Sequence, residues 1–327
     1  MSFDPPGFWS ARPGTSTAAK LLRPLGALYH AEVQRRLAST RPFKASVPVI
    51  CVGNATMGGV GKTPFVRWLS SFIRARGRHP HILTRGYGGT AKGPVLVTEG
   101  LTAAEVGDEP LLLSSAHPVW VSRDRAAGAA EAAQAGAELI IMDDGLQNPK
   151  LFKDLSFLLV DAEALFGNGE VFPAGPLREW PAAARDRCQA VVAMLPSTDS
   201  KTPRALKTLA AGRPLIEAWF AIDETSVPEG PLVAACGIGR PERFFQSLAA
   251  VGADLVGAEA FPDHHPFSPD EITALREKAS QLGATLVMTE KDVVRLPAAE
   301  RAAVAAIRGG IAVRNEAQVL ALLEKVI

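Results

Sequence analysis

Short apolar runs alternate with helical patterns between about residues 47 and 225. The runs are rich in β-branched residues, and segments such as the alanine-rich stretch 125–135 separate them. This alternation is typical of a mostly parallel β-sheet with helices on both faces. The predicted strands are 47–52, 81–84, 95–98, 119–122, 139–142, 157–160, 190–195 and 215–222.

A second α/β series follows the turn-forming residues 228–231. It combines strands at 232–236, 255–258 and 285–288 with helices at 241–251, 269–281 and 316–327. Ser268 is placed to cap the helix that begins at Pro269. We therefore expect three parts, and the sequence leaves open which domain the final helix packs on. The parts are an N-terminal helical segment (1–45), a larger α/β domain (46–226) and a smaller α/β domain (227–327).

The N-terminal segment from about residue 15 to residue 39 has an apolar side and scattered basic residues. Leu21, Leu25, Leu28 and Tyr29 lie on the apolar side, and Pro24 is expected to interrupt or bend the helix. Two interpretations are open. The helix packs on the domain core, or it lies in a membrane interface, where its basic residues attract anionic lipid.

Composition excludes some classes of protein. The net charge of the 327-residue chain is +1, so no surface for DNA or RNA is indicated. Three widely spaced cysteines favour buried thiols in a reducing compartment and imply no structural zinc. The N-terminus lacks the features of a secretory signal, and no apolar run approaches the length of a membrane span.

The first predicted strand leads into a glycine-rich loop and then into a helical pattern. In such a loop, backbone N–H groups cradle phosphate, a lysine neutralises its charge and a threonine hydroxyl holds magnesium. Thr56 stands where the strict Gly-x4-Gly-Lys-Thr pattern has its first glycine, so a turn that binds no ligand is the alternative. The flanking strand and helix favour a phosphate-binding loop of the P-loop NTPase type, made by Gly58, Gly59, Val60, Gly61, Lys62 and Thr63.

Charged residues follow two other predicted strands. Asp143 and Asp144 end the strand at 139–142, where a phosphate-loop enzyme places a carboxylate that supports the metal. A common Asp-Gly turn is the alternative. Arg85 begins a glycine-rich segment after the strand at 81–84, and it is expected either to contact phosphate or substrate or to lie in a flexible surface turn.

Two further segments carry candidate side chains. Asp108 precedes an apolar helix, which suits a helix cap, a solvated acid or the carboxylate that a kinase needs to activate a hydroxyl. Arg178 and Glu179 follow a proline- and glycine-rich loop. Arg178 is expected to stabilise phosphoryl charge or hold an anionic substrate, and a surface ion pair with Glu179 is the alternative.

The second series contains two polar clusters. Asp263, His264 and His265 lie together in one loop, where they are a weak metal signal because neighbours on an extended chain point to opposite sides. Residues 289–292, Thr-Glu-Lys-Asp, follow the strand at 285–288, at an edge where α/β domains place functional groups.

Taken together, these segments resemble the lipid A 4'-kinases, the tetraacyldisaccharide 4'-kinase family of Gram-negative bacteria. The resemblance rests on motifs in the family's order along most of the chain. They are Gly53-Asn54, Gly58-Gly-Val-Gly-Lys-Thr-Pro64, Thr84-Arg-Gly-Tyr-Gly-Gly89, Gly107-Asp-Glu-Pro110, Asp143-Asp-Gly-Leu-Gln147, Gly175-Pro-Leu-Arg-Glu179, Asp263-His264 and Thr289-Glu-Lys-Asp292. Thr56 then agrees with the family's own loop.

The resemblance implies transfer of the ATP γ-phosphoryl group to the 4'-hydroxyl of a tetraacylated glucosamine disaccharide 1-phosphate in lipid A biosynthesis. It implies a peripheral enzyme at the cytoplasmic face of the inner membrane, with the N-terminal helix on the anionic membrane surface. Oligomeric state stays open.

The resemblance also implies roles for individual residues. Asp108 is the expected catalytic aspartate, His264 its partner, and no role falls to His265. Lys62 and Arg178 are expected to act in catalysis, while Thr63, Asp143 and Asp144 serve Mg²⁺. The loop from Asn54 to Pro64 binds ATP, and Arg85, Gln147 and Glu179 are expected at the substrate or the rim of the site.

Two rival functions differ in class. A membrane-associated ATPase of the partitioning type has a similar loop with a lysine at the position of Met57, which cannot supply that charge. A nucleotide-binding adaptor would use the second domain for docking alone.

Overall fold

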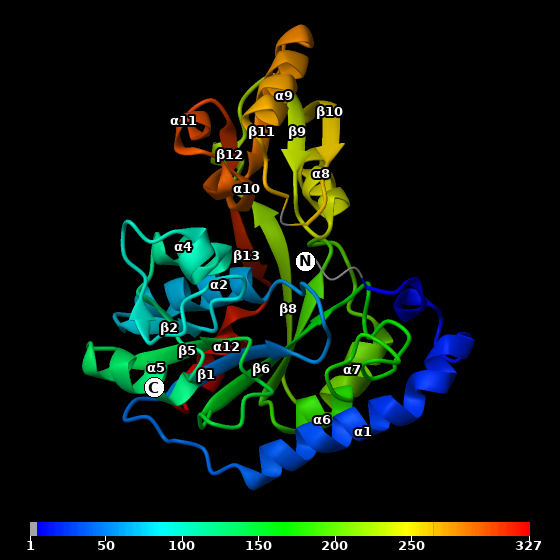
Figure 1. The fold of residues 1–327 in the computed structure, drawn as a ribbon, viewed down its shortest axis with the longest axis vertical. Coiled ribbons are helices and arrows are strands. Elements are labelled where there is room, and N and C mark those ends of the chain that lie inside the picture. The colour runs from blue at the N-terminus through cyan, green and yellow to red at the C-terminus, as the bar shows by residue number, and fades with distance from the viewer. Residues whose placement is uncertain (1–4, 264) are drawn as a thin grey trace.

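The computed structural model describes residues 5–263 and 265–327, and in them the chain forms two β-sheets that follow one another along the longest axis (Figure 1). The larger sheet is parallel except at its two edge strands. Its strands, in order across the sheet, are β13 (Gly309–Val313), β8 (Leu215–Ile222), β7 (Ala190–Leu195), β6 (Leu155–Asp161), β1 (Val49–Asn54), β5 (Leu139–Asp143), β2 (Pro80–Thr84), β4 (Val119–Val121) and β3 (Val95–Leu96).

Helices cover both faces of the larger sheet, which confirms the predicted fold class. Side chains alternate along each strand, so Ile50 and Val52 of β1 face one layer while Cys51 faces the other. The first layer contains α2 (Lys62–Arg74), α4 (Asp108–Ser114) and α12 (Glu316–Leu323). The second contains α5 (Arg125–Gln134), α6 (Pro181–Asp186) and α7 (Arg204–Ala210).

The smaller sheet is parallel and also covered on both faces. Its strands, in order, are β10 (Asp254–Ala260), β9 (Pro231–Cys236), β11 (Thr285–Thr289) and β12 (Ala305–Ile307). Helix α8 (Pro241–Ala250) packs on one face and α9 (Pro269–Gln281) on the other, while α10 (Glu290–Arg295) and α11 (Ala298–Arg301) follow β11. Ser268 caps α9 as predicted, and the Glu271 side chain completes the capping box.

The end of the chain returns to the larger sheet. Strand β13 pairs antiparallel with β8, and Val319 and Leu323 of α12 are buried in the larger core. The sequence predicts α12 but not β13, whose glycines Gly309 and Gly310 weaken the strand pattern. The division of the chain at residue 226 stays a prediction.

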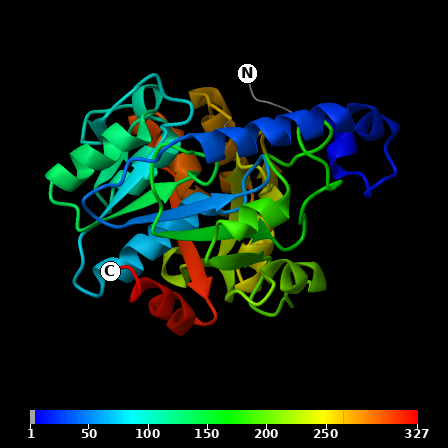
Figure 2. The same cartoon turned by 90° about the horizontal axis from the view of Figure 1, so that it is seen from below.

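Helix α1 (Thr17–Ser39) runs along the outside of the larger part, past α6 (Figures 1 and 2). It is continuous, with Pro24 and Gly26 inside it, so these residues do not interrupt the helix, while the predicted bend stays a prediction. Gly26 permits close packing, since a Cβ there would lie 2.6 Å from the Val171 carbonyl oxygen. Leu21 and Leu28, by contrast, are 76% and 67% exposed. No helix of the described chain is long and apolar enough to cross a membrane.

Candidate active site

The glycine-rich loop lies at the carboxyl edge of the larger sheet, between the end of β1 and the start of α2. Gly61, with a φ of 81°, is the N-cap of α2, so the first N–H groups of a 13-residue helix face the loop. Gly58 also has a positive φ, of 112°. Strand β8 is parallel to β1 and runs toward the smaller sheet, so this edge faces that sheet (Figure 1).

The loop lysine and threonine meet the two aspartates at the end of β5. Lys62 Nζ lies 3.2 Å from Asn54 Oδ1 and 3.7 Å from Asp144 Oδ1. Thr63 Oγ1 lies 3.4 Å from Asp143 Oδ2. The structure therefore brings the predicted nucleotide and metal residues together from two neighbouring strands.

Asp143 has an unusual environment. Its side chain is buried, and its Oδ1 has no hydrogen-bond partner among the described residues. Burial raises the pKa of Asp143 to about 7, and Glu109 and Asp144 contribute further repulsion. A cation beside the carboxylate would offset this penalty, so the site fits a bound Mg²⁺, which needs only one or two carboxylates besides phosphate and water.

Asp144 is paired instead. Arg178 Nη1 donates to Asp144 Oδ1 at 2.7 Å. Although burial opposes the shift, Lys62 and Arg178 lower the pKa of Asp144. The two adjacent aspartates therefore differ: Asp144 is held as an anion by two cations, whereas Asp143 Oδ1 has no hydrogen-bond partner among the described residues.

Glu179 is not on the rim of the site. Its side chain has no exposed surface, and it accepts hydrogen bonds from Gln34, Gln147 and Arg187. Gln147 also donates to the Asn54 carbonyl oxygen at 2.9 Å, behind the loop. Instead of the expected rim position or a surface ion pair with Arg178, Glu179 is the buried centre of a polar cluster whose other side chains are partly buried. Through Gln147 this cluster contacts the backbone of Asn54.

Asp108 begins α4 and so is not the residue before the helix, since Gly107 takes the N-cap position. The segment around Gly107 packs backbone to backbone on the Arg85–Gly89 loop. A Cβ on Gly107 would lie 2.4 Å from the Tyr87 carbonyl oxygen, and a Cβ on Gly89 would lie 2.5 Å from that of Glu105. The glycines therefore serve close packing of two loops, one of which carries the exposed Arg85 and the other the partly buried Asp108.

Two residues near the site escaped sequence analysis. Arg125, the first residue of α5, is 3% exposed and its Nε has no partner among the described residues. Burial lowers the pKa of Arg125 to about 10, against the attraction of Asp143 and Asp144. Arg295 of α10 donates from Nε to Asp108 Oδ2 at 2.9 Å. The only sequence signal for Arg125 is its place just after a strand, and Arg295 has none.

The loop that contains Asp263, His264 and His265 is described by the structure only in part. His264 lies outside the described residues, so its predicted pairing with Asp108 stays a prediction. His265 Nε2 lies 3.0 Å from Glu271 Oε1, and its ring packs against Phe261 and Phe267. This is a structural role. Among the residues that the structure describes, no group of three or more His, Cys, Asp or Glu side chains is placed to hold a metal ion.

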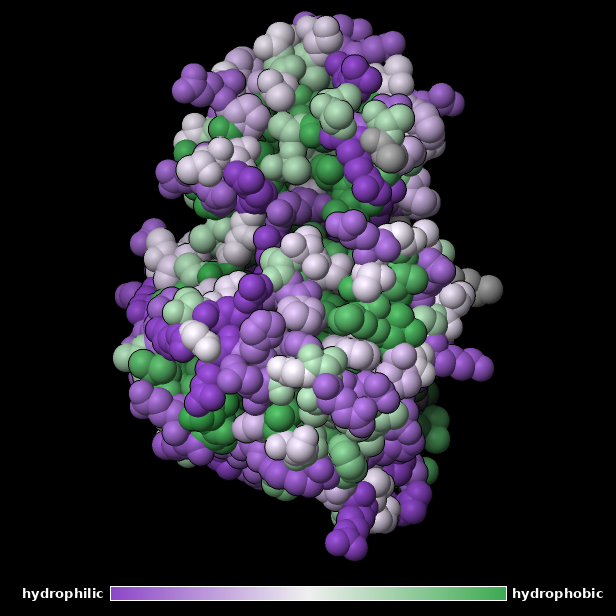
Figure 3. Space-filling view, turned by 90° about the vertical axis from the view of Figure 1, so that its left-hand side faces the viewer, coloured by the Kyte–Doolittle hydropathy of each residue, from purple (hydrophilic) through white to green (hydrophobic). Residues whose placement is uncertain are grey.

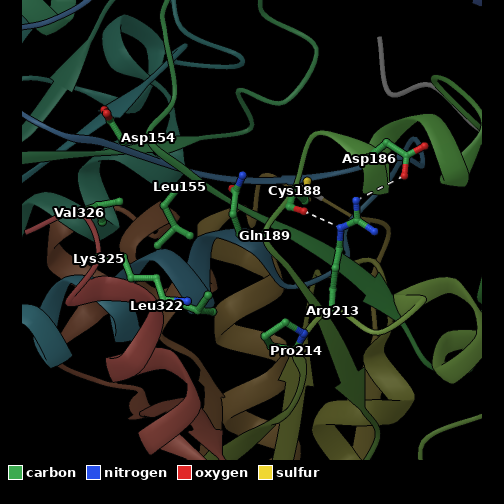
Figure 4. Close-up of a pocket in the computed structure, with 10 residues that line it drawn as sticks. All are labelled: Asp154, Leu155, Asp186, Cys188, Gln189, Arg213, Pro214, Leu322, Lys325 and Val326. Atoms are coloured by element: carbon green, nitrogen blue, oxygen red, sulfur yellow. Dashed lines mark hydrogen bonds and ion pairs between the residues drawn. The ribbon is translucent and has the colours of Figure 1, made fainter.

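A separate pocket lies at the opposite edge of the larger sheet (Figure 4). Asp154, Gln189 and Pro214, which directly precede β6, β7 and β8, line it together with residues of the C-terminal segment. It is therefore remote from the loop at the carboxyl edge and takes no part in the candidate site.

A family model described as tetraacyldisaccharide-1-P 4'-kinase matches residues 18–327. The chain belongs to the tetraacyldisaccharide-1-P 4'-kinase family. It is 49% identical over 314 residues to the tetraacyldisaccharide 4'-kinase of Rhodospirillum centenum, which covers 94% of this chain and 92% of that protein. The corresponding protein of Methylobacterium sp. strain 4-46 is 49% identical over 319 residues, 94% of this chain and 93% of that protein.

A solved structure agrees with this assignment. The crystal structure of LpxK from Aquifex aeolicus in complex with ATP matches with a TM-score of 0.75 at 27% identity, covering 94% of this chain and 99% of that one. The predicted tetraacyldisaccharide 4'-kinase family is therefore confirmed, and the chain is a kinase of lipid A biosynthesis. The partitioning-type ATPase and the adaptor are not favoured.

Proposed function

We propose that this kinase uses ATP and Mg²⁺ to phosphorylate the 4'-hydroxyl of a tetraacylated glucosamine disaccharide 1-phosphate at a membrane surface. The observation that carries the proposal is the meeting of Lys62 and Thr63 with Asp143 and Asp144 at the edge that faces the smaller sheet. The relatives named tetraacyldisaccharide 4'-kinase and the ATP-bound structure support the choice of substrates.

The loop and the start of α2 bind and orient the nucleotide. Backbone N–H groups between Gly58 and Thr63 would contact the phosphates, and Lys62 would neutralise charge on the β and γ groups. Thr63 and Asp143 would hold Mg²⁺, which supplies charge stabilisation when it is bound. Arg178, whose side chain donates to Asp144 and whose backbone N–H donates to the Ala55 carbonyl oxygen, would stabilise the transferring phosphoryl group.

The acceptor side uses Asp108. A carboxylate within hydrogen-bond reach of the sugar hydroxyl would orient it and accept its proton as the new P–O bond forms. The proton would pass from the hydroxyl to Asp108, the bond between the γ-phosphorus and the β–γ bridging oxygen would break, and ADP would leave with that oxygen. His264 is proposed as the partner of Asp108 on the strength of the family resemblance alone.

Helix α1 is proposed as the membrane contact of a peripheral enzyme at the cytoplasmic face of the inner membrane. Its exposed leucines Leu21, Leu25 and Leu28 lie on the surface away from Gly26, which packs on the protein. Such a face can enter the lipid interface and present the acylated headgroup to the site.

The test is incubation of purified protein with ATP, Mg²⁺ and a tetraacyl disaccharide 1-phosphate in vesicles, followed by mass spectrometry. We expect one added phosphate on the lipid, and its loss in the Asp108→Ala and His264→Ala variants. The double variant should be little less active than the less active single variant, because the effects of substituting residues that act as a unit do not add up. ATP hydrolysis without a phosphorylated lipid would contradict the proposal.

A further inference from the structure

The Thr289–Asp292 cluster lies at the start of α10 and contains a fully buried carboxylate, that of Asp292. Thr289 is the N-cap of α10, and its hydroxyl lies 2.6 Å from Asp292 Oδ2. The Gly237 N–H, just beyond the end of β9, donates to the same oxygen at 3.2 Å. Asp292 is therefore fixed to two strands of the smaller sheet and has no exposed surface.

Arg295 extends this cluster by one helical turn. Its Nη1 lies 3.2 Å from Asp292 Oδ1 and 3.2 Å from the Gly237 carbonyl oxygen. Its side chain is only 7% exposed. Because the guanidinium is planar and anchored through Nη1, its orientation is set by the smaller sheet.

The Nε of the same guanidinium contacts the other part of the molecule. Arg295 Nε donates to Asp108 Oδ2 at 2.9 Å, which links residues separated by 187 positions in the chain. Helix α10 lies next to α4 (Figure 1). Figure 3 shows hydrophilic side chains gathered where the outline narrows between the two parts.

We propose that Arg295 is a positioning residue that orients the Asp108 carboxylate for the acceptor hydroxyl, and that the Thr289–Asp292 cluster exists to hold its guanidinium. The inference rests on the proposed function of Asp108. A carboxylate bound at one oxygen by a rigid donor has a restricted rotation, which keeps it in a reactive geometry. The orientation of Asp108 then depends on the smaller sheet being in place.

A second ion pair between α10 and a helix of the larger part supplies a matched control. Arg67 Nη1 of α2 lies 2.8 Å from Glu290 Oε2 of α10, and among the described hydrogen bonds and ion pairs Arg67 contacts Glu290 and not Asp108. Removing this pair weakens the packing of α10 on the larger part but leaves the Asp108–Arg295 contact. Arg67→Met therefore removes a contact between the same two parts without the positioning effect, and unlike Arg295→Met it leaves no fully buried carboxylate unpaired.

The experiment compares Arg295→Met, Arg295→Lys, Arg67→Met and Asp108→Asn in the vesicle kinase assay, with thermal unfolding and ATP affinity measured for each. We expect Arg295→Met to lower kcat by about 10- to 100-fold, less than loss of a general base, while KM for ATP changes by less than about 3-fold. Arg295→Lys, which keeps the charge but not the two-armed geometry, should recover part of the lost kcat. Arg67→Met should stay within about 3-fold of the unaltered protein.

The outcomes separate this inference from the proposed function. If Asp108→Asn turns over normally, Asp108 is not the base and the proposed role of that residue fails. If Asp108→Asn is inactive while Arg295→Met matches Arg67→Met, only the inference about Arg295 is wrong. If Arg295→Met unfolds at a much lower temperature, Arg295→Lys decides: a lowered kcat at unchanged KM for ATP supports the inference, and a normal kcat overturns it.

Discussion

The side-chain amide of Gln34 donates a hydrogen bond of 3.0 Å to the buried carboxylate of Glu179. Glu179 also accepts from Gln147, and Gln147 donates to the Asn54 carbonyl oxygen beneath the phosphate loop. Helix α1 is thus joined, through the buried Glu179 carboxylate and two partly buried glutamine side chains, to the segment that carries the nucleotide site. The proposed membrane helix and the loop share one hydrogen-bonded support.

Replacement of Gln34 by leucine removes one of the donors to a fully buried carboxylate. Hydrogen bonds to charged groups contribute roughly 1.5–3 kcal/mol, so we expect a lower unfolding temperature and a kcat reduced by a few-fold. Vesicle binding should not change, because the exposed leucines of α1 remain. Glu32→Gln, on the same helix but in an exposed pair with Arg35, is the control. A normal kcat with normal unfolding for Gln34→Leu would show that this contact supports nothing.

Replacement of Lys62 by alanine tests the phosphate loop. Loss of the one loop cation should lower kcat/KM by at least on the order of 10²- to 10³-fold, since a preorganised charge at a transferring group is lost. The fold should persist, because Lys62 is the first residue of α2 and helix starts tolerate alanine. Lys44→Ala, in a half-exposed pair with Asp154, is the matched control. Near-normal turnover of Lys62→Ala would overturn the loop assignment.

Local patterns were sufficient to predict the sheet, its helical layers and the loop. The loop is a continuous segment, and Asp143 and Asp144 lie directly after a clearly apolar strand, so parallel strand order alone brings them together. Strand β13 was missed because two glycines and a short run gave little signal. The sequence indicated many of the functional residues but did not indicate which distant residues they contact.

Contacts that depend on how separate helices dock could not be predicted. Arg295 meets Asp108 only because α10 docks on α4, and Gln34 meets Glu179 only because α1 packs along the larger part. Glu179 was expected at the rim of the site from the family resemblance, with a surface ion pair to Arg178 as the alternative. Its burial depends on three donors from three separate segments, none of which a single-segment pattern reveals.

Charged substitutions on α1 test the proposed membrane contact. Leu21, Leu25 and Leu28 are 53% or more exposed, so changing all three to glutamate should leave unfolding unchanged. Burial of a leucine contributes about 1.5–3 kcal/mol, and the triple variant should therefore bind anionic vesicles at least on the order of 100-fold more weakly. ATP affinity should not change. Leu96→Glu, on the edge strand β3, is the control, and unaltered sedimentation of the triple variant with vesicles would refute the membrane contact.

His117 makes the stability of the fold depend on pH. The ring is buried, with Nδ1 3.0 Å from Ser70 Oγ, and burial, with Arg74 and Arg67 nearby, lowers the pKa of His117 to about 4. The unfolded chain binds a proton near pH 6.5 and the folded chain does not, so this contribution to stability is present above pH 6.5 and is lost as pH falls toward 4.

Between pH 7 and pH 5 this linkage amounts to about 2 kcal/mol of unfolding free energy. We expect His117→Gln to be less stable than the unaltered protein at pH 7, but to lose less stability on acidification. Chemical denaturation at the two pH values measures both effects. His79→Gln, at an exposed histidine, is the control and should keep the full pH dependence. An equal loss of stability in His117→Gln and the unaltered protein would show that His117 is not the titrating group.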